Sequence, residues 1–351
     1  MSIIEVARKA GVSKSTVSRV INQQPGVAPE AAEAVKRAIK AIGYILPTVR
    51  RGPKPGLKRG LKTGNVALLA MGSRIADLYR MPVFPQLLHA IERTLAEQNL
   101  KLVLGNLAPD CQLPTVLEDQ QADGLLLYGK WANMPPAIRN RLKQFTATWI
   151  VREHSDPQHD FDHVIYNNPA VGRLAAEYFI ERSHKHVAFL NVAPEHTAFA
   201  ERLTVFKAAL AAQDVKVSVL VPEGNEKRLE LATFQMLVER AMKMPDRPTG
   251  LFIPSDTQLP GLYHSMHQLG IKPCRDIEIL SCDNEEQFLG QLTPRPATID
   301  IKLDLVGRQA VRQLLWRLKN PNEAGRMNIY VEPTLVLPKK TVISVEAPDA
   351  G

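Results

Sequence analysis

Most residues of the stretch SKSTVSRVIN, at positions 13–22, carry side chains that donate hydrogen bonds, and none of them is acidic. Hydroxyl, ammonium, guanidinium and amide groups donate to phosphate oxygens and to the edges of bases in the DNA major groove. The stretch therefore predicts a DNA-contacting surface made by Ser13, Lys14, Ser15, Thr16, Arg19 and Asn22.

Short helices are expected to position these donors. Apolar residues recur at helical spacing from Ile4 to Ala10, where Gly11 interrupts the pattern. Ser13 is a suitable N-cap for a second helix, because its hydroxyl accepts from the free N–H groups of the first turn. A third helix that begins at Pro29 is expected to cover the first two. Residues 1–46 are therefore predicted to form an all-α helix-turn-helix head.

The positive charge of the chain is concentrated in this region. Residues 1–62 hold 13 of the 44 Lys and Arg residues and only three acids, whereas the formal net charge of all 351 residues is +8. The remainder of the chain is therefore slightly acidic. A basic head on a near-neutral body indicates that the head binds a polyanion.

Residues 47–63, PTVRRGPKPGLKRGLKT, form a basic linker in which Pro and Gly prevent a continuous helix. Arg50, Arg51 and Lys54 are its candidate DNA contacts. One interpretation is an extended segment along a narrow A·T minor groove, similar to an AT-hook, because Pro keeps the chain extended and Gly52 lets the backbone approach. The other is a flexible spacer that raises the affinity for any DNA.

From residue 64 to residue 351, continuous apolar segments alternate with helical ones in two successive series. The first runs from NVALLAM at 65–71 to ATWIVRE at 147–153, and the second from PAVGRLAAEYFIERSH at 169–184 to DIEILSCDN at 276–284. Buried strands that alternate with helices are typical of doubly wound parallel sheets. The sequence predicts an α/β body with two such lobes.

Other classes of function find little support. The chain has no run of about 20 apolar residues and no export signal, so a cytoplasmic protein without a membrane span is expected. No nucleophile elbow, P-loop or dinucleotide fingerprint occurs, and neither a catalytic residue nor a cofactor is assigned. The three cysteines, at positions 111, 274 and 282, lack metal-binding spacing and are expected to be buried thiols. His154, His159 and His163 lie among acids in HSDPQHDFDH; a solvated loop is favoured there over a metal site.

The head resembles the DNA-binding domain of the lactose repressor/galactose repressor (LacI/GalR) family of bacterial transcription regulators. The residues that carry the resemblance are Val6-Ala7, Ala10-Gly11-Val12-Ser13, Thr16 to Val20, Asn22 and Tyr44. The resemblance implies that Lys14, Ser15 and Arg19 read base edges, and that Ser13 and Thr16 hold phosphates. In that family a hinge helix follows the head. Here the run from Tyr44 to Pro47 has one residue extra, and no helix-compatible run follows it.

The resemblance extends more weakly over the body and implies lobes of the periplasmic-binding-protein type that close around a small effector. It places the effector contacts at Phe84, Arg202, Ser255, Asp256 and Asp283. Arg202 would bind hydroxyls or a carboxylate, Asp283 would accept from a sugar hydroxyl, and Phe84 would stack on a sugar ring. From the residues alone, a structural Arg202–Asp283 pair and a core role for Phe84 also remain open. At position 205, Val replaces the Gly that is usual in the family, and at position 81, Met replaces the usual polar residue. An unusual, narrowed or empty pocket is therefore also considered.

The resemblance thus implies a sequence-specific regulator, in the first place a repressor of sugar-utilisation genes. It would bind a pseudo-palindromic double-stranded DNA operator as a homodimer, under the control of a sugar or sugar derivative. Two alternatives remain open. One is a DNA-binding protein whose body takes no ligand, and the other is a cytoplasmic sugar-binding module with a vestigial head.

Overall fold

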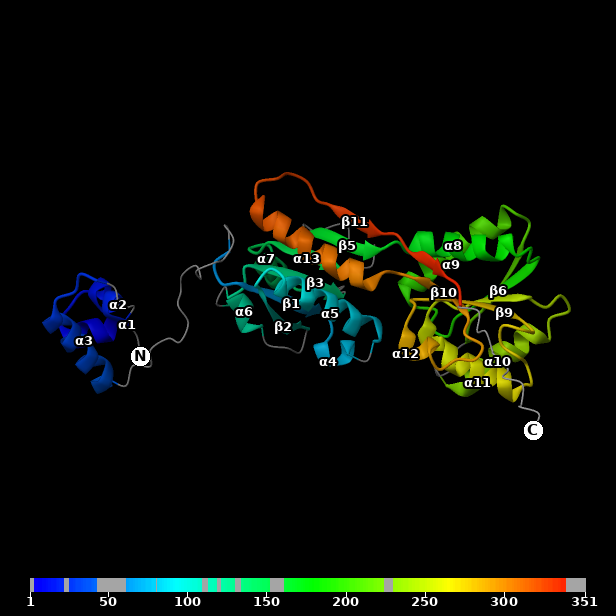
Figure 1. The fold of residues 1–351 in the computed structure, drawn as a ribbon, viewed down its shortest axis with the longest axis horizontal. Helices are drawn as coiled ribbons and strands as arrows, with labels where there is room; N and C mark the ends of the chain where they lie inside the picture. Colours follow the sequence, from blue (N-terminus) through cyan, green and yellow to red (C-terminus); the bar gives the residue numbers. More distant parts are fainter. Residues whose placement is uncertain are drawn as a thin grey trace, which may run out of the picture. The chain divides into compact units, whose positions relative to one another are not determined.

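The computed structural model describes residues 3–21, 25–42, 61–79, 81–108, 113–118, 121–129, 134–151, 161–223 and 230–338 (Figure 1). The chain divides into two compact units, residues 1–55 and residues 56–351. Within the described residues, no helix is both long enough and apolar enough to cross a membrane.

The first unit is a bundle of three helices, α1 (Ile3–Ala10), α2 (Lys14–Ile21) and α3 (Pro29–Ile42). Gly11 ends α1 with a positive φ of 66°, and the following N–H of Val12 donates to the carbonyl of Ala7 at 3.1 Å. Glycine adopts this conformation without a steric penalty, which is why the turn is tight here. The small core consists of Val6, Ala7, Val17, Val35 and Ala38. The predicted helix-turn-helix is confirmed.

The second unit contains two α/β lobes. The first lobe is built on a six-stranded sheet of order β11-β5-β4-β3-β1-β2, in which every pairing is parallel. Its strands are β1 (Asn65–Met71), β2 (Lys101–Leu107), β3 (Gly124–Gly129), β4 (Ala147–Ile150), β5 (Asp162–Tyr166) and β11 (Asn328–Val331). Its helices are α4 (Ile75–Leu78), α5 (Val83–Ala96), α6 (Thr115–Glu118), α7 (Pro136–Leu142) and α13 (Leu303–Lys319).

The second lobe repeats this plan with a sheet of order β12-β10-β9-β8-β6-β7, in which only β12 is antiparallel to its neighbour. Its strands are β6 (His186–Leu190), β7 (Lys216–Leu220), β8 (Gly250–Phe252), β9 (Glu278–Cys282), β10 (Ala297–Asp300) and β12 (Thr334–Val336). Its helices are α8 (Asn168–Glu181), α9 (Thr197–Ala211), α10 (Leu231–Met242), the 3₁₀ helix η1 (Asp256–Gln258), α11 (Leu259–Gln268) and α12 (Glu286–Leu289).

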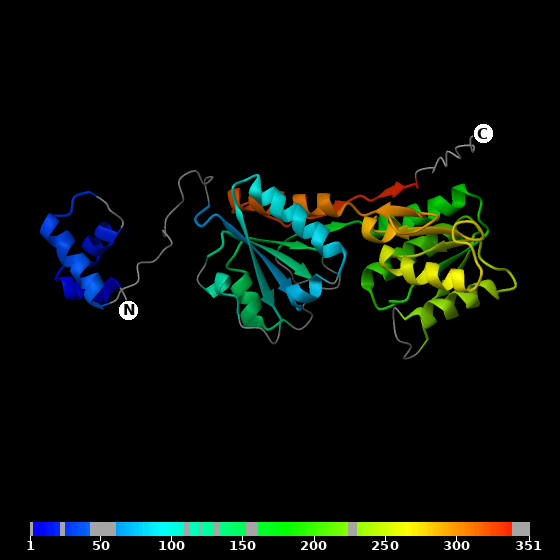
Figure 2. The same cartoon turned by 60° about the horizontal axis from the view of Figure 1, so that its bottom comes forward.

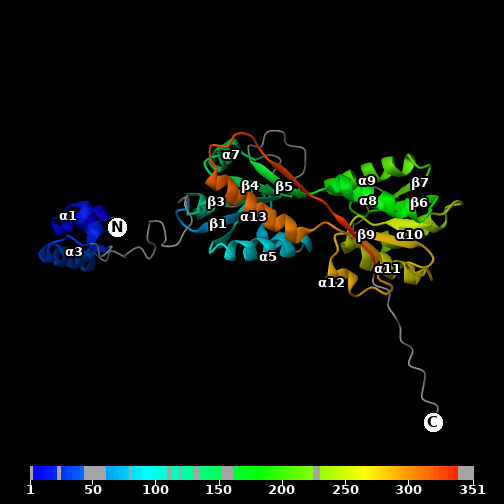
Figure 3. The same cartoon turned by 45° about the horizontal axis from the view of Figure 1, so that its top comes forward.

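The chain passes between the lobes after β5, after β10 and after β11. After β10 the chain returns to the first lobe as the long helix α13, drawn in orange in Figures 2 and 3, which packs beside α5. Both faces of each sheet are buried. In β1, for example, Leu68 packs into one apolar cluster and the next residue, Leu69, into another. Strands buried on both faces explain why the sequence shows continuous apolar runs instead of alternation.

One sequence-based expectation is wrong. The sequence predicts a solvated loop at His163, but this residue lies in β5 with only 5% of its surface exposed. Asp162 lies in the same strand and is 3% exposed. His154 and His159 lie outside the described residues. Of the cysteines, Cys282 is buried and Cys274 partly exposed, whereas Cys111 also falls outside the described part of the chain.

Candidate functional site

The first candidate surface is the outer face of α2. Lys14, Ser15 and Arg19 are exposed, whereas Val17 is fully buried against the other helices. Ser15 and Arg19 are four residues apart and therefore lie on the same face of the helix. The structure thus brings the predicted base-reading side chains together on one exposed helix, and a helix of this kind fits the DNA major groove.

Three hydroxyl groups gather at the N-terminus of α2. The Oγ of Ser13 accepts a hydrogen bond from the N–H of Thr16 at 3.1 Å, which confirms Ser13 as the N-cap. The hydroxyls of Ser15 and Thr16 lie 2.7 and 2.9 Å from the same oxygen. Free N–H groups and the helix dipole favour a phosphate at such an end. Asn22, Arg50, Arg51 and Lys54 fall outside the described residues.

The second candidate site lies at the junction of the lobes, around Arg202 of α9, which is only 1% exposed. Its Nε donates to the side-chain oxygen of Asn168 at 3.0 Å. Its Nη1 donates to the carbonyl oxygen of Pro254 and, at 3.3 Å, to Oδ1 of Asp283. A buried guanidinium needs such partners, because an unpaired buried charge is strongly unfavourable.

Asp283 follows the carboxyl end of β9 and is 5% exposed. Its second oxygen, Oδ2, accepts from the hydroxyl of Ser255 at 2.7 Å. Its backbone has a φ of 110°, and its N–H donates to the carbonyl of Ile299 at 2.9 Å. A non-glycine residue in this conformation is strained, and such strain is found preferentially at binding and catalytic sites.

Asp256, whose carboxyl group interacts electrostatically with that of Asp283, is fully buried. Its carboxylate accepts from the hydroxyl of Ser281, from that of Thr298 at 3.1 Å and from the N–H of Glu285 at 2.8 Å. Glu285 is also fully buried, but neither of its carboxyl oxygens has a hydrogen-bond partner. Three buried carboxyl groups therefore lie together, those of Asp256, Asp283 and Glu285. Of these, Asp283 forms an ion pair with Arg202.

The surroundings favour the protonated forms of these acids. Burial, and secondly the charge of Asp283, raise the pKa of Asp256 to about 7. Burial, followed by the charges of Asp283 and Asp256, raises the pKa of Glu285 to about 8. Burial also raises the pKa of Asp283, although Arg202 opposes the shift.

Aromatic rings from both lobes approach the guanidinium of Arg202. Its Cζ lies 5.7 Å from the ring centroid of Tyr166, at the end of β5 in the first lobe. It lies 5.6 Å from the ring centroid of Phe199, on α9 itself. Carboxyl ends of strands in open α/β sheets are the usual place for a bound ligand. No local sequence pattern marks Tyr166 as a site residue, because only the meeting of the lobes brings it near Arg202.

Phe84 is not part of this group. It is fully buried in the main apolar cluster, with its ring centroid 5.1 Å from that of Tyr128 and 5.6 Å from that of Tyr79. The arrangement favours the core interpretation of Phe84 over ring stacking on a ligand. Tyr79 is 51% exposed and is therefore the accessible ring among these three, although no periodic pattern in the sequence marks it.

A helix-turn-helix head with a basic exposed face, attached to two parallel-sheet lobes that gather polar side chains at their junction, defines a DNA-binding protein with a body of the ligand-binding type. Residues 2–46 match the family described as bacterial regulatory proteins, lacI family, and residues 176–339 match the periplasmic binding protein-like domain. The chain belongs to the LacI/GalR family and is a DNA-binding transcriptional regulator.

Similar proteins cover almost the whole chain. The HTH-type transcriptional repressor PurR of Pectobacterium atrosepticum is 29% identical over 342 residues, which is 95% of each chain. A complex of the transcriptional regulator CelR with cellobiose has a TM-score of 0.62 and 23% identity, over 96% of this chain and 98% of that one. The lac repressor dimer bound to operator and the anti-inducer ONPF has a TM-score of 0.63 and 19% identity, over 97% and 99% of the two chains.

Proposed function

We propose that the chain is a repressor that binds a two-fold symmetric operator as a homodimer in the cytoplasm, and that a small molecule held between its lobes changes its affinity for that operator. The observation that carries the DNA-binding part is the exposed face of α2, on which Lys14, Ser15 and Arg19 stand together above a capped N-terminus. Asn22, Arg50, Arg51 and Lys54 are proposed as further DNA contacts.

A homodimer is supported by the lac repressor structure, whose protein binds its operator as a dimer. In this chain β2 and β7 each lie at one edge of their sheet, and Leu104 on β2 is 41% exposed. Exposed apolar edges of this kind are normally covered. We infer that a second copy of the chain covers them, and sedimentation equilibrium measures this directly.

The proposed effector is a sugar or sugar derivative. The CelR structure is a complex with cellobiose, and in this chain Arg202, Ser255, Asp256 and Asp283 offer donors and acceptors where the lobes meet. A body without ligand is the second candidate, because these four side chains are buried and already bonded to one another or to neighbouring residues. In that case Arg202 and Asp283 form a structural ion pair, and the other two side chains only stabilise it.

Replacing Arg19 or Lys14 by Ala is expected to weaken binding to the cognate operator by about 1 to 3 kcal/mol and to relax sequence preference, because each removes a donor to the bases. The affinity is measured by fluorescence anisotropy on a site selected from random DNA. Lys36→Ala is the matched control, since Lys36 is an exposed cation on α3 that pairs with Glu33 at 2.9 Å. Equal affinities for all four proteins would contradict the assignment of α2 as the reading helix.

A thermal-shift screen of pentoses, hexoses, disaccharides such as cellobiose, and sugar phosphates tests the effector. We expect one compound to raise the melting temperature, since a ligand that binds only the folded state stabilises it. Asp283→Asn is expected to abolish this rise relative to its own ligand-free protein. If no compound shifts the wild type, the ligandless body becomes the better description.

A further inference from the structure

The first described residues of the body are held by one carboxylate, that of Asp123. The N–H groups of Lys62, Thr63 and Gly64 donate to it at 2.7, 2.9 and 2.7 Å. Gly64 has a positive φ of 74°, a conformation that glycine adopts without a steric penalty. Consecutive N–H groups that converge on an anion form a strong, charge-assisted contact. We call these four residues the Asp123 clamp.

The residues on either side of the clamped segment are fixed as well. Leu61 packs against the main apolar cluster. Asn65 begins β1, and its side-chain nitrogen donates to the carbonyl of Gln121 at 2.9 Å. The carbonyl of Asn65 in turn accepts from the N–H of Asp123 at 2.8 Å. Both backbone and side-chain bonds therefore join the segment that enters the body to the segment that carries the clamp.

Asp123 is itself held in place by the end of α13. The next residue, Gly124, begins β3. A methyl group on Gly124 would lie 3.0 Å from Cδ1 of Leu314 and 3.2 Å from Cδ1 of Leu318. These two side chains of α13 therefore pack directly on the backbone beside Asp123.

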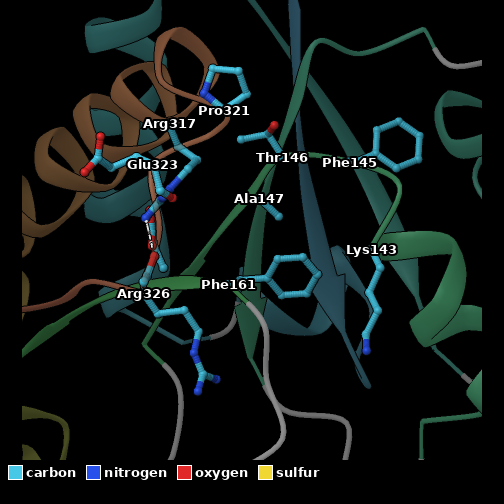
Figure 4. Close-up of a pocket in the computed structure, with 11 residues that line it drawn as sticks. Lys143, Phe145, Thr146, Ala147, Phe161, Arg317, Pro321, Glu323 and Arg326 are labelled. Atoms are coloured by element: carbon cyan, nitrogen blue, oxygen red, sulfur yellow. Dashed lines mark hydrogen bonds and ion pairs between the residues drawn. The ribbon is translucent and has the colours of Figure 1, made fainter.

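The end of α13 is fixed to the same edge of the sheet by Arg317. Its Nη2 and Nε donate to the carboxylate of Asp162, at the start of β5, at 2.7 and 2.9 Å. The side chain of Asp162 is 2% exposed and also accepts from Gln313 at 2.7 Å. Figure 4 shows Arg317 on the wall of a cavity of about 400 Å³ at this edge. The carboxylate that holds the linker thus stands on a well-packed part of the first lobe.

We propose that Asp123 is a positioning residue for operator binding, which fixes the point at which the linker leaves the body. This rests on the proposed function, in which a homodimer places two heads on one operator. Two heads bind at once only when both linkers start from defined points. Ordering the backbone of one free residue changes an equilibrium constant by roughly tenfold. A clamp that is formed before binding removes this cost.

The test uses the full-length protein with Asp123→Asn. The amide has the same shape as the carboxylate, but its NH₂ group cannot accept, so at least one N–H of the clamp loses its partner. Affinity for the two-fold symmetric operator is expected to fall about tenfold or more. Affinity for a duplex with one half-site, which needs only one head, is expected to change by less than about twofold. Loss of a negative charge alone would strengthen DNA binding, so charge cannot explain a weaker complex.

Amide hydrogen exchange reports on the clamp directly. In Asp123→Asn, the N–H groups of residues 62–64 are expected to exchange at least about tenfold faster than in the wild type. The amides of β1 are expected to stay protected, which shows that the lobe remains folded. Glu181→Gln is the matched control, because it neutralises an exposed carboxylate at the end of α8. It is expected to change neither the exchange nor the affinities.

A second pair of variants tests the clamp from the linker side and leaves Asp123 intact. Lys62→Pro removes one of the three donors, because proline has no N–H. Lys62→Gln removes the same charge and keeps the donor. Lys62→Pro is expected to bind the operator more weakly than Lys62→Gln, with equal binding of the half-site.

Fast exchange of residues 62–64 in the wild type would overturn the proposal. So would an unchanged operator affinity in a variant whose clamp amides exchange freely, or equal losses on the operator and the half-site. A wild type that binds neither duplex would instead contradict the proposed function, whereas normal binding with no effect of Asp123→Asn or Lys62→Pro would contradict only the role of the clamp.

Discussion

Replacing Arg202 by Met will lower the free energy of unfolding by about 3 to 5 kcal/mol, because it leaves the buried carboxylate of Asp283 without its cation. The guanidinium is 1% exposed and bonds Asn168 and the carbonyl of Pro254 in addition to Asp283. Methionine fills much of the same volume but satisfies none of these groups. The measurement is urea unfolding at neutral pH, followed by circular dichroism.

Two further variants separate a lost ion pair from lost packing. Arg173→Met removes an Arg whose side chain is 55% exposed and whose contact with Glu177 spans 3.8 Å, so a change below about 1 kcal/mol is expected. Arg202→Met combined with Asp283→Leu removes both charges, and it is expected to recover much of the lost stability. A small loss for Arg202→Met alone would show that the pair is solvated in the protein.

Glu285→Gln is expected to make the protein more stable than the wild type, by an amount that grows with pH. The folded protein raises the pKa of Glu285 from 4.5 to about 8, so between these values the folded state keeps a proton that the unfolded state has released. Stability then falls as the pH rises through this window and levels off above it. Gln stays neutral, and the advantage of the variant near pH 8 is expected to be about 2 to 4 kcal/mol.

The measurement is the urea midpoint at pH values from 4 to 9. Glu286→Gln is the control, since this neighbouring side chain is 74% exposed and pairs with Arg295 at 2.8 Å. Asp256 also makes the free energy of unfolding fall as the pH rises, because its pKa is raised from 3.8 to about 7. Parallel pH profiles for the wild type and Glu285→Gln would show that folding does not raise the pKa of Glu285, and would contradict the prediction.

The burial of Phe84 could not be predicted from the sequence pattern. The sequence places an aromatic residue two positions after Pro82, near the first turn of α5, but it does not say whether the ring meets solvent. In the structure Tyr128 and Tyr79 cover it, and it joins the core. For His163 the prediction of a solvated loop is wrong. The residue follows a run of polar residues in the sequence, but it lies in a short buried strand.

By itself the sequence determined the helix-turn-helix, the N-cap at Ser13, the alternation of strands and helices, and the concentration of positive charge near the amino terminus. All of these depend on residue types and on neighbours within about four positions, where helix and strand periodicities act. The pairs that make the sites are distant in sequence. Arg317 and Asp162 lie 155 positions apart, and Arg202 and Asp283 lie 81 apart. Only the tertiary structure decided that these charges meet and that Glu285 is buried beside two other carboxyls. Burial and long-range contact depend on how the lobes pack, and that is a property of the whole chain.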